Sequence, residues 1–270
     1  MASDLATGTG ARGRASVGSK TLRTDRWWLQ PVLTVTGLSL WVIYAVVRAA
    51  LQTDYYVPAY HYLSPFSSPC LSDSCVAGAS VFGTPFGSFP PLLPFAILTL
   101  PFLLLFRLSC YYYRKAYYRS FWQSPPACAV AEPHKTYTGE TRQPLLLQNA
   151  HRYFWYAAVL ISLINTWDVV DAFHGKGGGV GFGLGTLIML VNVVLLWCYT
   201  LGCHSCRNIT AGRLTHFSRH PVRYWLWQQV SRLNGHHMGF AWATLASLVV
   251  TDLYIALVSG GVFSDFRFFN

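Results

Sequence analysis

The stretch that decides the fold is Phe182–Asn208, FGLGTLIMLVNVVLLWCYTLGCHSCRN. Its first part, Phe182–Leu201, contains no charged residue, and its last part places Cys203, His204 and Cys206 within four positions. A bilayer core about 30 Å thick needs roughly 20 apolar residues in a helix. This stretch therefore predicts a transmembrane helix that ends in three potential metal ligands.

The composition of the whole chain supports a membrane protein. The 270 residues are 53% hydrophobic and 11% charged, and the mean hydropathy is +0.32. Soluble domains carry about 25% charged residues. The net charge of +10 would suit nucleic-acid binding, but the basic residues lie between apolar runs and no nucleic-acid-binding motif occurs. We therefore exclude nucleic acid as a partner and expect membrane lipid.

Five apolar stretches are long enough to span a membrane, so the predicted fold is an all-α bundle of five transmembrane helices. Residues 1–26 are predicted to be a flexible basic tail, 27–262 the membrane domain and 263–270 a short tail. Pro101 is predicted to kink the second span, and Gly183 and Gly185 to allow close helix packing in the fourth. The spans are Trp27–Leu51, Pro90–Cys110, Tyr153–Phe173, Phe182–Leu201 and Met238–Val262.

The basic residues predict the orientation. Lys and Arg concentrate in the N-terminal tail and in segments 107–152 and 207–232, whereas the 52–89 loop has none. Cytoplasmic loops carry the excess of Lys and Arg. We therefore expect a multi-pass protein of the plasma membrane, with the N-terminus in the cytosol and the C-terminus outside.

Cys70 and Cys75 lie in the predicted outer loop, in the sequence CLSDSC. Disulfides persist on the outer side of a membrane and rarely in the cytosol. We expect a Cys70–Cys75 disulfide there, with two unlinked thiols as the alternative.

Residues that bind metals recur at the predicted cytosolic ends of four spans. Cys110 ends the second span, His151 begins the third, and His236 and His237 begin the fifth, while the CHSC sequence ends the fourth. Because these positions share one depth, we expect a common site. For any one of these histidines, the alternative is a residue that anchors the helix at the interface.

Three metal centres are compatible with these residues. Zinc accepts two Cys and two His, but packed helices need no zinc to fold. A b-type haem would use His151 and His237 and leave the cysteines unexplained. A Rieske-type [2Fe–2S] cluster takes two Cys on one iron and two His on the other, which matches Cys203, Cys206, His151 and His237. Cys110 is the reserve thiolate, and His204 is expected to face away from the cysteine pair.

Four segments resemble the membrane-anchor subunit of actinobacterial succinate dehydrogenases. The likeness covers most of the chain from about Trp27. It implies a flavoprotein (FAD) subunit and an iron–sulfur subunit as partners, docked on the cytosolic face by segments 107–152 and 203–237, and a membrane quinone, either menaquinone or ubiquinone, as acceptor. It also favours a Rieske-type cluster over haem b. The segments are RLSCYYYRKAYYRSFW, NAHRYFWYAAVLI, LGCHSCRN and LNGHHMGFAW.

Five polar or aromatic side chains at the depth of the ligand layer are candidates for quinone binding, because a quinone pocket needs donors within an apolar wall. They are Arg107, Tyr111, Tyr153, Trp155 and His204. Each is alternatively an interfacial residue. The alternative functions are a haem b anchor of this or another quinone-linked reductase, and a non-redox transporter, although no inverted repeat supports the last.

The third and fifth spans also carry polar residues toward their outer ends. Intramembrane acids are functional candidates by default. We expect them either to form a proton path or to cap the outer end of the bundle. They are Asn165, Asp168, Asp171 and Asp252.

Overall fold

The computed structural model describes residues 23–90, 94–133 and 142–270, so most of the predicted N-terminal tail lies outside the described residues. Its contacts divide the chain into two compact units. The first unit comprises residues up to Ile43 together with Arg107–His151, and the second comprises Tyr44–Phe106 and Arg152–Asn270.

Four helices are long and apolar enough to cross a membrane, close to four of the five predicted spans. They are α2 (Leu29–Leu51), α5 (Arg142–Asp171, apolar from Gln148), α6 (Leu184–Leu201) and α9 (His237–Ser259). The chain is mostly helical, as predicted.

The second predicted span, Pro90–Cys110, is not one long helix in its described part. It contains a 3-10 turn, η1 (Phe95–Leu98), and then α3 (Leu100–Leu108), which has nine residues. Pro101 lies in the first turn of α3, where a missing N–H costs no hydrogen bond. The predicted kink at Pro101 is therefore wrong: this proline helps to begin a helix.

The first unit takes in the chain from Arg107, near the end of α3, and contains α4 (Tyr111–Tyr117) and a π-helical turn, η2 (Tyr118–Trp122). The guanidinium of Arg114 lies over the rings of Tyr111 and Tyr118, at 5.5 and 5.8 Å from their centroids. Stacked cations and aromatic rings of this kind are typical of a membrane interface.

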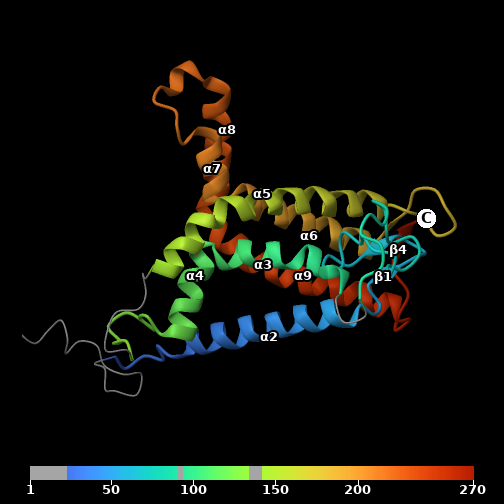
Figure 1. The fold of residues 1–270 in the computed structure, drawn as a ribbon, viewed down its shortest axis with the longest axis horizontal. Helices are drawn as coiled ribbons and strands as arrows, with labels where there is room; N and C mark the ends of the chain where they lie inside the picture. The colour runs from blue at the N-terminus through green and yellow to red at the C-terminus, as the bar shows by residue number, and fades with distance from the viewer. Residues whose placement is uncertain (1–22, 91–93, 134–141) are drawn as a thin grey trace, which may run out of the picture. The chain divides into compact units, whose positions relative to one another are not determined.

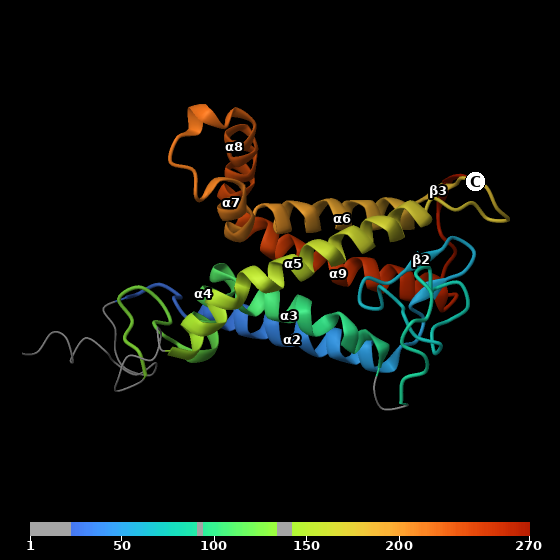
Figure 2. The same cartoon turned by 45° about the horizontal axis from the view of Figure 1, so that its top comes forward.

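In the second unit, α6 and α9 pack along their lengths and continue into a helical hairpin (Figure 1). The hairpin consists of α7 (His204–Ala211), η3 (Phe217–Arg219) and α8 (Pro221–Gly235). It projects from the ends of α6 and α9 in both views (Figures 1 and 2). Pro221 occupies the first turn of α8, a position that proline favours.

The opposite end of the second unit is built from loops and short strands. Strands β1 (Tyr56–Val57) and β2 (Tyr62–Leu63) form one antiparallel pair. Strand β3 (Phe182–Gly183) pairs with β4 (Arg267–Phe269), so the predicted tail 263–270 carries a strand. These strands of two or three residues are the departure from an all-α fold.

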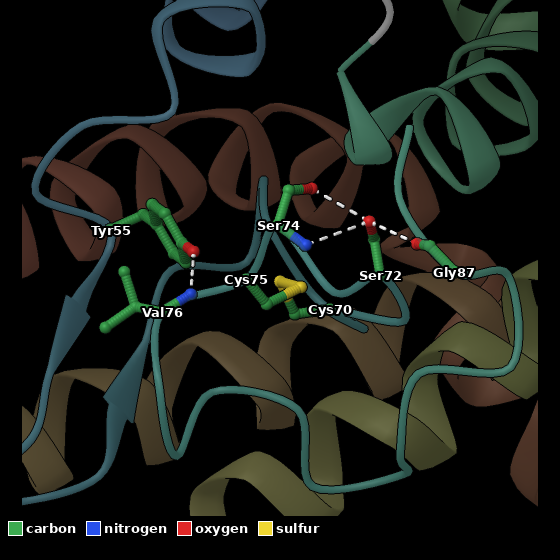
Figure 3. Close-up of a disulfide and its surroundings, with 7 residues drawn as sticks. All are labelled: Tyr55, Cys70, Ser72, Ser74, Cys75, Val76 and Gly87. Carbon is green, nitrogen blue, oxygen red and sulfur yellow. Dashed lines mark hydrogen bonds between the residues drawn. A yellow bond between two sulfur atoms is a disulfide. The ribbon is translucent and has the colours of Figure 1, made fainter. Parts of the chain in front are cut away.

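The Cys70–Cys75 disulfide is present in the 52–89 loop, as predicted (Figure 3). Ser72 donates to the Gly87 carbonyl at 2.8 Å, and the Tyr55 hydroxyl accepts from the Val76 N–H at 2.7 Å. These bonds hold the backbone on both sides of the bridge. We call this the disulfide end of the second unit.

Two buried carboxylates tie distant segments of the second unit together. Asp252 of α9 accepts from Arg48 of α2 at 2.7 and 3.2 Å, from Tyr44 at 2.5 Å and from Ser64 at 2.5 Å. This pairing satisfies an acid that is 1% exposed.

The second carboxylate, Asp265, organises the β3–β4 region in the same way. It accepts from the hydroxyls of Tyr62 at 2.9 Å and Tyr254 at 2.6 Å, and from the backbone N–H of Gly185 at 2.9 Å. Gly183 and Gly185 were predicted to allow helix packing. Instead, a Cβ on Gly183 would meet Asp265, and one on Gly185 would meet the Tyr62 ring.

Candidate functional site

The CHSC sequence lies at a break between two helices. α6 ends at Leu201, and Cys203 adopts an extended conformation as the N-cap of α7. Its Sγ accepts a hydrogen bond from the N–H of Ser205 at 3.4 Å. The predicted end of the fourth span at Leu201 is therefore confirmed, and Cys206 lies in a new helix that Cys203 caps.

Both thiols of the CHSC sequence are buried, Cys203 at 1% and Cys206 at 8% exposure. Burial raises the pKa of the Cys206 thiol above its ordinary value, and a hydrogen bond with Thr210 opposes this. A cysteine at a helix N-terminus has its thiolate favoured by the helix dipole. The fold thus brings two buried thiols to the base of the hairpin.

His237 lies beside this helix break. Its ring is 1% exposed and stacks on the Tyr199 ring, with centroids 4.8 Å apart and planes 6° apart. A Cβ on Gly202 would lie 3.3 Å from Nδ1 of His237. Gly202 directly precedes Cys203, so His237 lies close to the residue before that cysteine.

A second Cys–His neighbourhood occurs in the first unit. The Oγ of Ser109 lies 2.8 Å from Nδ1 of His151, and the next residue, Cys110, is 2% exposed. Cys110 is the N-cap residue of α4, as Cys203 is of α7. Each unit therefore holds one buried cysteine at a helix start, adjoining a residue that contacts a histidine.

These cysteines and histidines do not form a complete metal-binding site. In the part of the chain that the structure describes, no three His, Cys, Asp or Glu side chains are grouped so as to hold a metal ion. The structure therefore provides pairs of ligands of the right chemistry without a full coordination shell.

The candidate quinone ligands have different surroundings. In the first unit, Arg107 is 6% exposed, donates to the Tyr113 hydroxyl at 2.6 Å and lies 5.8 Å from the Trp41 ring centroid, whereas Tyr111 is 49% exposed. Arg107 is thus held by aromatic side chains, and Tyr111 lies at the surface.

In the second unit, Tyr153 is 69% exposed and Trp155 is buried. The indole N–H of Trp155 donates to the Thr200 carbonyl at 2.9 Å, which joins α5 to α6. His204 is exposed, in keeping with the expectation that it faces away from the buried cysteines. Partial burial, followed by the charge of Arg207, lowers the pKa of His204.

The comparison with known families decides the identity. Residues 29–261 match the family described as actinobacterial succinate dehydrogenase subunit SdhC. The chain belongs to this SdhC family. The resemblance predicted from the sequence is thereby confirmed, and the chain is a membrane-anchor subunit of succinate dehydrogenase, an oxidoreductase.

A solved structure supports the assignment of this SdhC subunit. The chain is 62% identical to a chain of the structure entitled "Mycobacterium smegmatis Sdh1 complex in the apo form", with a TM-score of 0.88. The match covers 97% of this chain and 99% of that one. No curated protein matches.

Sequence reasoning missed two residues that position the histidines of this SdhC subunit. Ser109 contacts His151 and Tyr199 stacks on His237. Ser109 directly precedes Cys110, so its position in the sequence could have indicated that it lies near the predicted site. Tyr199 lies 38 positions before His237 on a different helix, and nothing in the spacing indicates that contact.

Proposed function

We propose that this subunit anchors the flavoprotein and iron–sulfur subunits of succinate dehydrogenase to the plasma membrane and passes their electrons to a membrane quinone. The observation that carries the proposal is the occurrence of two buried Cys–His neighbourhoods at helix starts. Membership of the SdhC family supports the presence of these two partner subunits. They are also needed to oxidise succinate, because no flavin or dinucleotide motif occurs in this chain.

The donor set supports a Rieske-type [2Fe–2S] cluster as the redox group. Two thiols and two imidazoles match its ligands, whereas haem b would use the imidazoles alone. We propose Cys203, Cys206, His151 and His237 as its ligands, with Cys110 as the reserve thiolate. When bound, the cluster supplies one-electron transfer between the partner and the quinone.

Residues that contact these proposed ligands orient them or influence the reduction potential of the cluster. The Ser205 N–H donates to the Cys203 sulfur, and hydrogen bonds to sulfur influence the reduction potential of a cluster. Ser109 fixes the ring orientation of His151, as residues that contact metal ligands commonly do. Tyr199 holds the plane of His237.

The α7–α8 hairpin is the proposed docking surface for the iron–sulfur subunit. It combines four exposed arginines with five exposed apolar side chains that the described chain leaves uncovered. Apolar anchors within a polar rim are typical of protein interfaces. The arginines are Arg213, Arg219, Arg223 and Arg232, and the apolar residues are Ile209, Phe217, Val222, Trp225 and Leu226.

Among the predicted quinone ligands, Arg107, Tyr111, Tyr153 and His204 remain candidates. Trp155 is a weaker candidate because its N–H already donates to Thr200. The quinone is menaquinone or ubiquinone, since both present two carbonyl oxygens to such donors.

The test is to replace both His151 and His237 with Ala in the assembled complex. Quinone reduction should collapse, while reduction of a soluble dye at the partner subunits continues. A Rieske-type electron paramagnetic resonance signal should disappear. Loss of a low-spin haem signal instead would assign the histidines to haem b, and full quinone activity would refute the redox role. His236→Ala is the matched control, because His236 is adjacent and exposed.

A further inference from the structure

A cavity large enough for one water molecule lies within the second unit, between α5, α6, α9 and the 52–89 loop. Four polar residues line it, and the rest of the wall is apolar. Asn192 and Thr251 are each eight residues from the helix end nearer the disulfide, so they lie about 12 Å into their helices. The polar residues are Asn165, Asp168, Asn192 and Thr251.

The hydrogen bonds of these side chains indicate what the cavity accepts. The amide nitrogen of Asn165 donates to the Ile161 carbonyl, which leaves its oxygen as an acceptor. The amide oxygen of Asn192 accepts from Ser247, which leaves its nitrogen as a donor. A wall that offers both donors and acceptors suits water, whereas a cation needs oxygen ligands alone.

Asp168 differs from the other buried acids of the unit. Asp252 is paired with Arg48, and Asp265 with Arg267. Asp168 is 4% exposed and accepts a hydrogen bond of 2.5 Å from Ser68, and it forms no ion pair with any described residue. An unpaired carboxylate is costly to bury in a membrane.

A line of titratable groups leads from Asp168 to the disulfide end. Asp171 lies three residues further along α5, on the same helix face. Nδ1 of His61 lies 3.1 Å from both carboxylate oxygens of Asp171, and the His61 ring stacks on that of His174 at 3.9 Å. The side chains of His61 and Asp171 are 31% and 28% exposed and so reach water.

The elements packed against the cavity bring few other charges to it. α6 contributes Asn192, the loop contributes Ser68, and α9 contributes Thr251. The acid that follows Thr251, Asp252, is held by Arg48.

We propose that Asp168 and this cavity form an internal proton-binding site that holds one water molecule and exchanges protons with the aqueous phase at the disulfide end through Asp171 and His61. In the exchange, a proton from water binds the Asp168 carboxylate to give the carboxylic acid, and returns by the same route. The proposal does not depend on the redox group or on the docking surface.

Infrared difference spectroscopy of the purified complex between two pH values tests the site. The wild type should show the C=O stretch of a protonated carboxylic acid, and Asp168→Asn should lack it. Asp54→Asn is the control, since Asp54 is an exposed aspartate in the 52–89 loop. Ser68→Ala keeps the acid but removes its hydrogen bond, so the band should move to higher frequency. An Asp168→Asn spectrum equal to that of the wild type, or an unmoved band in Ser68→Ala, would overturn the assignment.

The route and the water have their own tests. In heavy water, His61→Gln and Asp171→Asn should slow the deuterium shift of the Asp168 band at least severalfold. A rate unchanged in both variants would refute the route. Density for an ordered water in the cavity is expected in a high-resolution map of the complex, and an empty cavity in such a map would refute the hydrated site.

Discussion

The ring of Tyr62 fills the space that a side chain on Gly185 would need. A Cβ at Gly185 would lie 2.3 Å from Cε2 of Tyr62, well inside van der Waals contact. The hydroxyl of Tyr62 donates a hydrogen bond to Asp265, so the ring cannot move away without breaking that bond.

Gly185→Ala should therefore destabilise the protein, although alanine favours helices more than glycine. We expect a loss of roughly 1–3 kcal/mol, the usual cost of overpacking, measured as thermal unfolding of the complex in detergent. Gly239→Ala is the matched control in α9, because a Cβ there meets no heavy atom within 4 Å. Equal stability of the two variants would contradict the close fit.

Arg48→Leu should be more damaging than its position at a helix end suggests. It leaves the Asp252 carboxylate, 1% exposed, without its cation. Removing one partner of a buried ion pair costs about 3–5 kcal/mol, whereas an apolar replacement of both is often tolerated.

Thermal unfolding of Arg48→Leu and of the double variant Arg48→Leu/Asp252→Leu measures this difference. The double variant should recover much of the lost stability. If it were no more stable than Arg48→Leu alone, the unpaired charge would not be the cause.

Substitutions on the exposed surface of the α7–α8 hairpin should weaken binding of the iron–sulfur subunit. Trp225→Ala combined with Val222→Asp should weaken retention of the iron–sulfur subunit by about tenfold or more, or roughly 1.4 kcal/mol. Both side chains are more than half exposed. Co-purification is the measurement, and Trp167→Ala, on the apolar helix α5 with 50% exposure, is the control. Full retention of the iron–sulfur subunit by the double variant would show that this subunit docks on another surface.

Cysteine labelling tests the predicted orientation. On intact cells, a membrane-impermeant thiol reagent should react only after the disulfide is reduced. It should then label Cys75 before the buried Cys70. Cys128 is exposed but is predicted to face the cytosol, so it should stay unlabelled. Labelling of Cys128 without labelling of Cys75 would contradict the predicted orientation and indicate the opposite one.

Much of the fold was predictable because transmembrane helices are set by local composition. Three spans agree with α2, α6 and α9 to within about three residues, whereas α5 begins well before the predicted third span. The disulfide followed from the short spacing of Cys70 and Cys75 in a loop without Lys or Arg. The second span remains a prediction, because its described part consists of a 3-10 turn and the nine-residue α3.

The site was predictable in its residue types and less so in its geometry. Shared depth indicated Cys110, His151, Cys203, Cys206 and His237, but apolar periodicity gave no sign that Cys203 caps a new helix. Contacts such as that of Tyr62 with Asp265, 203 residues apart, depend on tertiary packing alone. Composition cannot indicate them.

The Arg48–Asp252 pair also has a consequence for how the chain is made. The two residues are 204 positions apart, and ribosomes add about 5–20 residues per second. The guanidinium therefore waits roughly 10–40 s after its own synthesis before its carboxylate exists. During that interval, the first helix must keep Arg48 in contact with water, lipid headgroups or a membrane insertase, and it can settle into its final depth only when the last helix arrives.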